Sequence, residues 1–151
     1  VVPGTGLALN NFMRWFDMEP QSPNAIGPGK KNEMCMSPVQ VFDDTGLRFL
    51  IGTPGSYGIM QTTPQMIMNV IDHKMNIAEA SQALRIHHQW LPDILGIEEG
   101  LNRDTQSLLQ DKGHHLKVQW AMGATQSIMR EKGMFLGYGD SRRRTSSCLG
   151  F

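Results

Sequence analysis

Two pairs of strand-like runs, each pair joined by a short turn, constrain this chain more than any other feature. In the first, residues 38–42 and 47–51 flank an Asp-Asp-Thr-Gly turn. In the second, residues 126–129 and 134–138 flank an Arg-Glu-Lys-Gly turn. Residues 38–42 alternate apolar and polar side chains, as a strand with one face on a core does. Since each pair of runs is joined by turn residues, we expect two β-hairpins in an antiparallel sheet.

Helical segments are predicted between the two hairpins. Asn76-Ile77-Ala78-Glu79 resembles a capping box and starts a short helix that reaches about Leu84. Residues 102–112 form a further helix, which Gly113 closes as its C-terminal cap. Strand-like runs lie before and after this helix, at residues 96–98 and 116–120.

One more helix follows the small-residue turn at residues 52–56 and extends to Ile71. Pro64 leaves the start of this helix open. The pair Thr63-Pro64 fits a cap and a first turn, so a regular helix could begin there. The alternative is a helix that starts near Tyr57 and kinks at Pro64. Since hairpins and helices alternate along the chain, we expect an α+β layered fold with helices packed on a sheet face.

Composition and charge limit the possible partners. The 151 residues suffice for one domain with a core, which we place at residues 1–151. Lys plus Arg and Asp plus Glu each number 14, so neither nucleic acid nor an anionic membrane surface is indicated as a partner. The basic run Arg142-Arg143-Arg144 is interpreted as a solvated surface or as part of a larger interface.

The cysteines and the chain start add little chemistry. Cys35 and Cys148 permit one disulfide, but no CxxC pair suggests zinc binding or redox work. No apolar stretch approaches the length of a membrane span. The start at Val1 lacks both an initiator Met and the features of a signal peptide, so we interpret it as a start in mid-structure.

Short motifs occur along the chain in the order in which they occur in gamma-glutamyltranspeptidases, and on them the chain resembles that family. The resemblance spans nearly the whole chain without large gaps. The motifs are Pro3-Gly4-Thr5-Gly6, Leu9-Asn10-Asn11, Pro28-Gly29-Lys30-Lys31, Met36-Ser37-Pro38, Gly52-Thr53-Pro54-Gly55, the run RIHHQWLPD at 85–93, GATQSI at 123–128 and GDSR at 139–142.

The resemblance implies a fold, a chemistry and a partner. Family members are N-terminal nucleophile hydrolases with a four-layer αββα sandwich, in which a precursor cleaves itself into a large and a small subunit. The small subunit begins with a threonine whose hydroxyl attacks the amide, and the acyl group passes to water or to an acceptor amine. This chain resembles the C-terminal part of that small subunit, so the nucleophile lies outside it and the large subunit is its implied partner. No cofactor is implied.

The turn at Gly55-Ser56 is the part of the reaction centre that this chain is expected to contain. By resemblance its backbone N–H groups donate to the oxyanion, because two successive amides before a helix can point at one developing negative charge. The family has Gly-Gly here. A backbone donor survives the change to Gly-Ser if Ser56 tolerates the local dihedral angles. Tyr57, the next residue, is added as a substrate-binding candidate.

The residues expected to grip the substrate depart from the gamma-glutamyl pattern. After Asn11, the family has a Gln or Glu and an Asp that hold the substrate amino group, whereas this chain has Phe12 and Trp15. Paired serines that bind the substrate carboxylate are replaced by Met34 and Cys35. An aromatic and thioether lining suits an apolar or aromatic acyl group better than a glutamyl zwitterion. In these positions the chain resembles the acylase-like branch of the family, which includes cephalosporin acylases.

Other residues allow more than one interpretation. Arg14 could bind a substrate carboxylate in place of the lost serines, but a solvated arginine is the preferred interpretation. Cys35 is interpreted as a small buried residue rather than a nucleophile. The pairs His87-His88 and His114-His115 are expected to hydrogen-bond in the core or at a subunit boundary, because adjacent strand residues face opposite ways and cannot chelate one metal.

The sequence therefore predicts an amide-bond hydrolase or acyltransferase that uses a threonine outside this chain, and this chain alone is expected to be inactive. The alternative is a non-catalytic remnant of the same fold. The sequence leaves the location of the protein open: resemblance to the family allows a periplasmic or secreted location, and a cytoplasmic location is also open.

Overall fold

The computed structural model describes residues 1–119 and 122–150. The chain divides into two compact units, Val1–Cys35 and Met36–Phe151. The single domain expected over residues 1–151 stays a prediction. No helix in the described part of the chain is long and apolar enough to cross a lipid bilayer.

The first unit is loop-rich, as predicted, and polar side chains hold its backbone. Its one helical segment is the 3₁₀ turn η1, Phe12–Trp15. The Asn32 side chain donates to the Phe12 carbonyl and the Asn24 side chain donates to the Trp15 carbonyl, both at 2.6 Å. Because irregular backbone has no ladder to satisfy its carbonyls, such side-chain donors replace secondary structure here.

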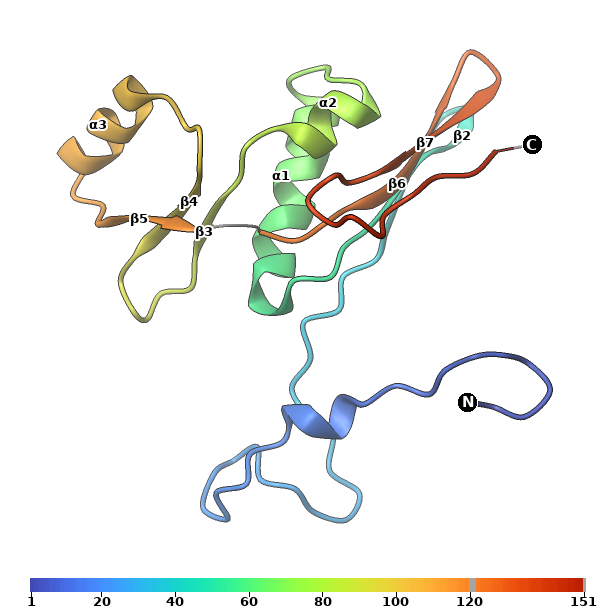
Figure 1. The fold of residues 1–151 in the computed structure, drawn as a ribbon, viewed down its shortest axis with the longest axis vertical. Helices are drawn as coiled ribbons and strands as arrows, with labels where there is room; N and C mark the ends of the chain where they lie inside the picture. Colours follow the sequence, from blue (N-terminus) through green and yellow to red (C-terminus); the bar gives the residue numbers. More distant parts are fainter. Residues whose placement is uncertain (120–121, 151) are drawn as a thin grey trace. The chain divides into compact units, whose positions relative to one another are not determined.

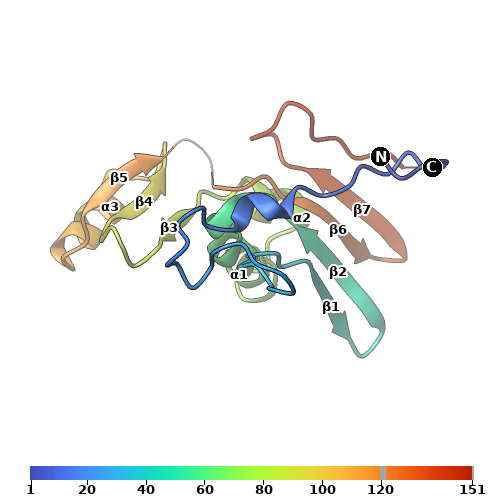
Figure 2. The same cartoon turned by 90° about the horizontal axis from the view of Figure 1, so that it is seen from below.

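The second unit is built on a four-stranded antiparallel sheet with the strand order β1-β2-β6-β7. Both predicted hairpins are confirmed, since β1 pairs with β2 and β6 pairs with β7, and the two hairpins join where β2 pairs with β6. Figure 2 shows them side by side. The strands are β1 Val39–Asp43, β2 Gly46–Gly52, β6 Gln126–Glu131 and β7 Met134–Gly139.

Two helices pack on one face of this sheet (Figure 1). They are α1, Ile59–Ile71, and α2, Ile77–Gln82, which has the predicted capping box at Asn76. Alternate residues of β2 and β6 point to the same face of the sheet, and there they contact the apolar side of each helix in one core. This core contains Phe49, Ile51, Met66, Val70, Ile77, Ala80 and Met129.

Pro64 lies inside α1, so the predicted helix start at Thr63-Pro64 is wrong. A short 3₁₀ segment, η2 at Ser56–Gly58, leads directly into the helix at Ile59, which is closer to the alternative that begins near Tyr57. Pro64 has no N–H to donate to the Met60 carbonyl one turn earlier. Met60 is 54% exposed, so water can reach this part of the helix surface. Packing of the buried side of α1 outweighs the local propensity of proline.

A second, three-stranded sheet has the order β3-β4-β5. Its strands are β3 Ile86–His88, β4 Leu95–Glu98 and β5 Leu116–Gln119, and the confirmed helix α3, Arg103–Asp111, connects the last two. Strands β4 and β5 run parallel, as a strand–helix–strand crossover requires. The sequence did not predict β3, and residue 120 of the predicted run 116–120 lies outside the described residues.

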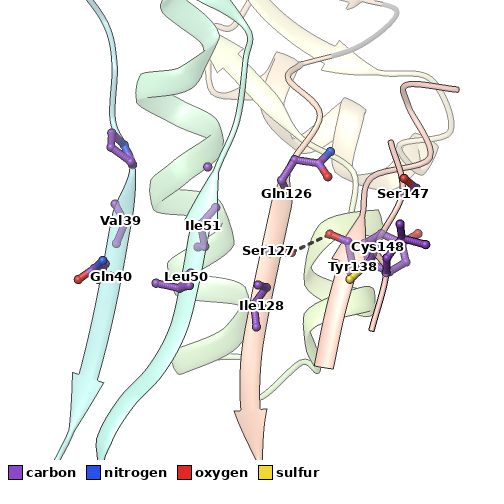
Figure 3. A pocket seen from close by; sticks show the side chains of 13 residues that line it. Val39, Gln40, Leu50, Ile51, Gln126, Ser127, Ile128, Tyr138, Ser147 and Cys148 are labelled. Carbon is purple, nitrogen blue, oxygen red and sulfur yellow. Dashed lines mark hydrogen bonds between the residues drawn. The ribbon is translucent and has the colours of Figure 1, made fainter. Parts of the chain in front are cut away.

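The face of the four-stranded sheet opposite the helices carries an open hollow of about 580 Å³ (Figure 3). Leu50 and Ile128 lie in its floor and Cys148 at its side. The chain end passes so close over β7 that a Cβ on Gly137 would lie 1.9 Å from the Cys148 Sγ. The hollow is therefore bounded by the sheet and by the final residues of the chain.

Candidate active site

The turn before α1 presents two unpaired backbone donors. Gly55 has φ 146° and ψ 17°, and Ser56 has φ 54°, so the chain twists sharply before η2. Only glycine adopts the first conformation without strain, and Ser56 tolerates the left-handed region at a cost of about 1 kcal/mol. In the part of the chain that the structure describes, the N–H groups of Gly55 and Ser56 donate to no protein acceptor. Such free amides at a helix start form a site for negative charge.

A second glycine, Gly123, packs directly against this turn. A Cβ on Gly55 would lie 3.1 Å from the Gly123 Cα, and a Cβ on Gly123 would lie 2.6 Å from the Thr53 Oγ1. The Thr53 hydroxyl donates to the Pro54 carbonyl at 2.7 Å and accepts from the Ala124 N–H at 3.0 Å. The two backbone segments thus hold each other in a fixed conformation.

Met122, beside Gly123, is held at both of its backbone polar groups. Its carbonyl accepts from the Thr62 hydroxyl of α1 and from the Arg85 Nη1, each at 2.9 Å. Its N–H donates to the Glu98 Oε1 at 3.1 Å. Met122 is itself buried. The position of the Gly55-Ser56 turn therefore depends on charged groups of the surrounding elements.

These charged groups form a buried network of two arginines and two carboxylates. The Arg85 Nη2 lies 2.7 Å from the Asp140 Oδ2, and their side chains are 2% and 1% exposed. Arg142 contacts both Asp140, at 3.2 Å, and Glu98. Asp140 also accepts from the Thr125 N–H at 3.0 Å. Because every carboxylate has an arginine partner and further donors, the burial of these charges is compensated.

The network sets the protonation of its members. Burial acts to raise the pKa of Asp140, but hydrogen bonds from the Arg142 N–H and the Arg85 guanidinium outweigh it, so the pKa lies below its ordinary value. Burial, with the nearby charge of Arg142, lowers the pKa of Arg85. Burial also acts to lower the pKa of Arg142, yet the hydrogen bond to Glu98 raises it overall.

Sequence reasoning assigned no role to these residues. Arg142 was expected in a solvated basic run, and this expectation is wrong for Arg142, whose side chain is only 14% exposed and binds Glu98 and Asp140. Arg143 and Arg144 are exposed, as predicted. Arg85 and Asp140 lie within motifs shared with the family, and these motifs were the available signal.

The predicted site residues fall into two groups, one in each unit. Gly55, Ser56 and Tyr57 lie together at the start of η2. With residues of β3 and β5, they line a cavity of about 150 Å³, and Tyr57 is partly buried there.

The other group lies in the first unit. Asn11 precedes η1, and Phe12, Arg14 and Trp15 lie within it, with Phe12 and Trp15 partly buried and Asn11 and Arg14 exposed. Met34 is exposed and Cys35 is buried. The bond from Asn32 to the Phe12 carbonyl brings η1 close to the segment that leads to Met34 and Cys35. Their role in substrate binding stays a prediction.

The histidines and cysteines have bonding or surface roles. The His87 Nδ1 lies 2.8 Å from the Gln61 Oε1, and the His88 Nε2 lies 3.0 Å from the Asp93 Oδ1. The side chains of His114 and His115 are exposed, so a core role is wrong for that pair, and a role at a subunit boundary stays a prediction. Cys35 and Cys148 are both free thiols, and the disulfide that the sequence permits is not formed.

Comparison with known proteins identifies the family. The family model for gamma-glutamyltranspeptidase matches residues 1–149. The glutathione hydrolase proenzyme of Escherichia coli (strain K12) is 43% identical over 135 residues, which cover 83% of this chain and 23% of that protein. The acylase ACY 1 proenzyme of Pseudomonas sp. (strain SE83) is 34% identical over 114 residues, or 75% of this chain and 20% of that protein.

A solved structure agrees with these relatives. Gamma-glutamyltranspeptidase from Pseudomonas nitroreducens superposes with a TM-score of 0.81 at 31% identity, over 100% of this chain and 86% of that chain. The fold is thus part of the four-layer αββα sandwich of N-terminal nucleophile hydrolases. Within that class, the chain belongs to the gamma-glutamyltranspeptidase family. It spans less than a third of the length of these curated relatives.

The contact between Gly123 and the turn predicts a specific loss of stability. We expect Gly123→Ala to lower the free energy of unfolding by at least about 1 kcal/mol more than Gly133→Ala does. Both glycines have positive φ, 82° and 80°, so both variants carry similar backbone strain, but only Gly123 has neighbours that a Cβ would strike. Urea unfolding of both variants measures the difference, and equal losses would contradict the proposed contact.

The lowered pKa of Asp140 predicts acid sensitivity. A carboxylate whose pKa is depressed by folding stabilises the fold above its ordinary pKa of 3.8, and this contribution is lost as the pH falls toward the depressed value. We expect Asp140→Asn to cost about 3 kcal/mol at pH 7 and to weaken the fall in stability below pH 4. Urea unfolding between pH 7 and pH 3 measures both effects, with the exposed Asp111→Asn as the control. Parallel pH profiles for Asp140→Asn and the unmodified protein would refute this role.

Proposed function

We propose that the complete protein cleaves amide bonds through an acyl-enzyme and passes the acyl group to water or to an amine. A threonine hydroxyl attacks the amide carbon, the C–N bond breaks, and the leaving amine takes up the proton of the hydroxyl. Water or an acceptor amine then attacks the ester and restores the hydroxyl. The observation that carries this proposal is the pair of free N–H groups at Gly55 and Ser56, which would bind the oxyanion of both tetrahedral intermediates.

The nucleophile and the partner would be supplied by the rest of the protein. The relatives are proenzymes, and this chain matches 23% of the Escherichia coli protein but 86% of one chain of the Pseudomonas nitroreducens structure. This difference supports a precursor that is divided into a large and a small subunit. The open sheet face around Leu50 and Ile128 supports it as well, because an apolar sheet face of this kind is normally covered by another layer.

The acyl specificity would come from the first unit. Phe12, Trp15, Met34 and Cys35 offer rings and sulfur atoms at positions where the family grips a glutamyl group with polar side chains. Asn11 is a further substrate-binding candidate in this unit, and Arg14, which is exposed, could bind a substrate carboxylate. An apolar or aromatic acyl group, as in acylase substrates, fits this lining better than a charged one.

A substrate panel tests this specificity. We expect the complete protein to cleave an aromatic acyl amide with a kcat/KM at least about tenfold above that for gamma-glutamyl-p-nitroanilide, since the latter would leave a buried ammonium without a partner. Trp15→Asp should shift that ratio toward the gamma-glutamyl substrate, and Trp90→Asp, at an exposed site, should not. Efficient gamma-glutamyl turnover with little activity on other amides would overturn the specificity. No turnover of any amide would support the non-catalytic alternative.

The division of the site between chains predicts that residues 1–151 alone are inactive. The isolated chain should show no amide hydrolysis, because it provides oxyanion donors without the nucleophile. It should also bind the dye ANS through the open sheet face, and Leu50→Lys should reduce that binding more than the exposed Leu108→Lys. Turnover by the isolated chain would contradict the proposal and would make the Cys35 thiol the first group to test.

A further inference from the structure

A glutamine side chain of α1 occupies the outer edge of β3. Among the described residues, β3 pairs with a strand on one side only, where it meets β4. On its other side, the Gln65 side-chain amide donates to the Ile86 carbonyl at 2.9 Å and accepts from the Ile86 N–H at 3.0 Å. Two residues of neighbouring antiparallel strands exchange the same pair of bonds. The Gln65 side chain therefore takes the place of a residue in a further strand.

Gln61 makes a second contact with this edge, one helical turn before Gln65. Its Nε2 donates to the His88 carbonyl at 3.2 Å, and its Oε1 lies 2.8 Å from the His87 Nδ1. Four helix residues rise about 6 Å and two strand residues rise about 6.8 Å. Glutamines four positions apart on α1 therefore match backbone groups two positions apart on β3, and this match aligns the helix with the strand.

The contact with β3 acts on the part of α1 that adjoins the free amides. The helix begins three residues after Ser56, and Gln61 lies in its first turn. The next residue, Thr62, donates to the Met122 carbonyl, so the first turn is held at two points by two different elements. Because the helix is continuous with the turn before it, a rotation of its first turn would redirect the N–H groups of Gly55 and Ser56.

We propose that Gln61 and Gln65 are positioning residues for the oxyanion site, because they hold the first turns of α1 against β3 and so fix the direction of the Gly55 and Ser56 amides. The inference rests on the proposed function of that turn. Both glutamines act through the helix rather than on the substrate. An amide stabilises the transition state only when it points to the place where charge develops, so a small rotation slows the chemical step and leaves substrate binding unchanged.

Kinetics of the complete protein, with the amide that the unmodified protein cleaves best, test this role. Gln65→Leu keeps the bulk of the side chain but removes both bonds to β3. Ile86 is 38% exposed, so water can reach its backbone groups and the variant can fold. We expect kcat to fall about tenfold, less than the loss of a whole oxyanion donor, and KM to stay within about twofold. Gln61→Leu should change kcat in the same direction, and Gln110→Leu, at an exposed position of α3, is the matched control that should retain kcat.

A transition-state mimic separates positioning from a general loss of structure. When the threonine hydroxyl adds to phenylboronic acid, an O–B bond forms, the proton leaves to solvent, and the boron becomes tetrahedral and anionic, as the reacting carbon does in the tetrahedral intermediate. We expect the Ki of this inhibitor to rise in each glutamine variant by the factor by which kcat falls. A smaller fraction of folded protein would instead lower the apparent kcat and leave Ki unchanged.

The results that contradict the positioning role differ from those that contradict the proposed function. Unchanged kcat in both glutamine variants, a lowered kcat with unchanged Ki, or an equal fall in Gln110→Leu would overturn the positioning role and leave the proposed function intact. Absence of inhibition of the unmodified protein would overturn the oxyanion site, and absence of amide turnover would overturn the proposed function. Either of these two results would remove the positioning role as well.

Discussion

The geometry of the candidate site depends on the ion pair between Arg85 and Asp140. Both side chains are almost completely removed from water. A charge buried in this way without a partner would cost several kcal/mol. Arg85 spreads its donors over Asp140, the Ser81 carbonyl and the Met122 carbonyl, all within 2.9 Å. One side chain therefore joins α2, the end of β7 and the segment that packs on the Gly55-Ser56 turn.

Glu98 and Arg142 extend this arrangement to the second sheet. Glu98 ends β4, and its two oxygens accept from the backbone N–H groups of Met122 and Arg85 as well as from Arg142. The two sheets, which share no strand, are tied together at this point. It follows that the free amides at Gly55 and Ser56 are positioned by these charges through Met122 and Gly123. Substitutions distant from the turn should thus alter it.

Local sequence signals predicted the local structure well. Several elements are specified by residues only a few positions apart. Examples are the turn at residues 43–46, the capping box at Asn76 and the closing Gly113. Pro64 left the start of α1 undecided in the sequence, because the buried face of that helix outweighs the local preference of proline. The sequence predicted the two strands and the helix between them, and that order of elements agrees with the parallel pairing of β4 and β5.

The site itself was predicted only where a motif marked it. Resemblance to the family pointed to the turn at Gly55-Ser56, and the structure adds that its amides are free. The network could not be predicted from spacing, because Arg85 and Asp140 lie 55 positions apart and a bond over that distance has no periodic signature. For the residues of the first unit, a role in acyl specificity is a proposal that rests on resemblance to the family.

Buried charges hold the Gly55-Ser56 turn in place. The most direct measurement is the amide NMR resonances of Gly55, Ser56 and Ala124 in the folded Arg85→Gln protein, with Arg103→Gln, on the exposed side of α3, as the reference. The account predicts that all three resonances shift or broaden in Arg85→Gln and stay in place in the reference. A folded Arg85→Gln protein with unchanged resonances at Gly55 and Ser56 would contradict it.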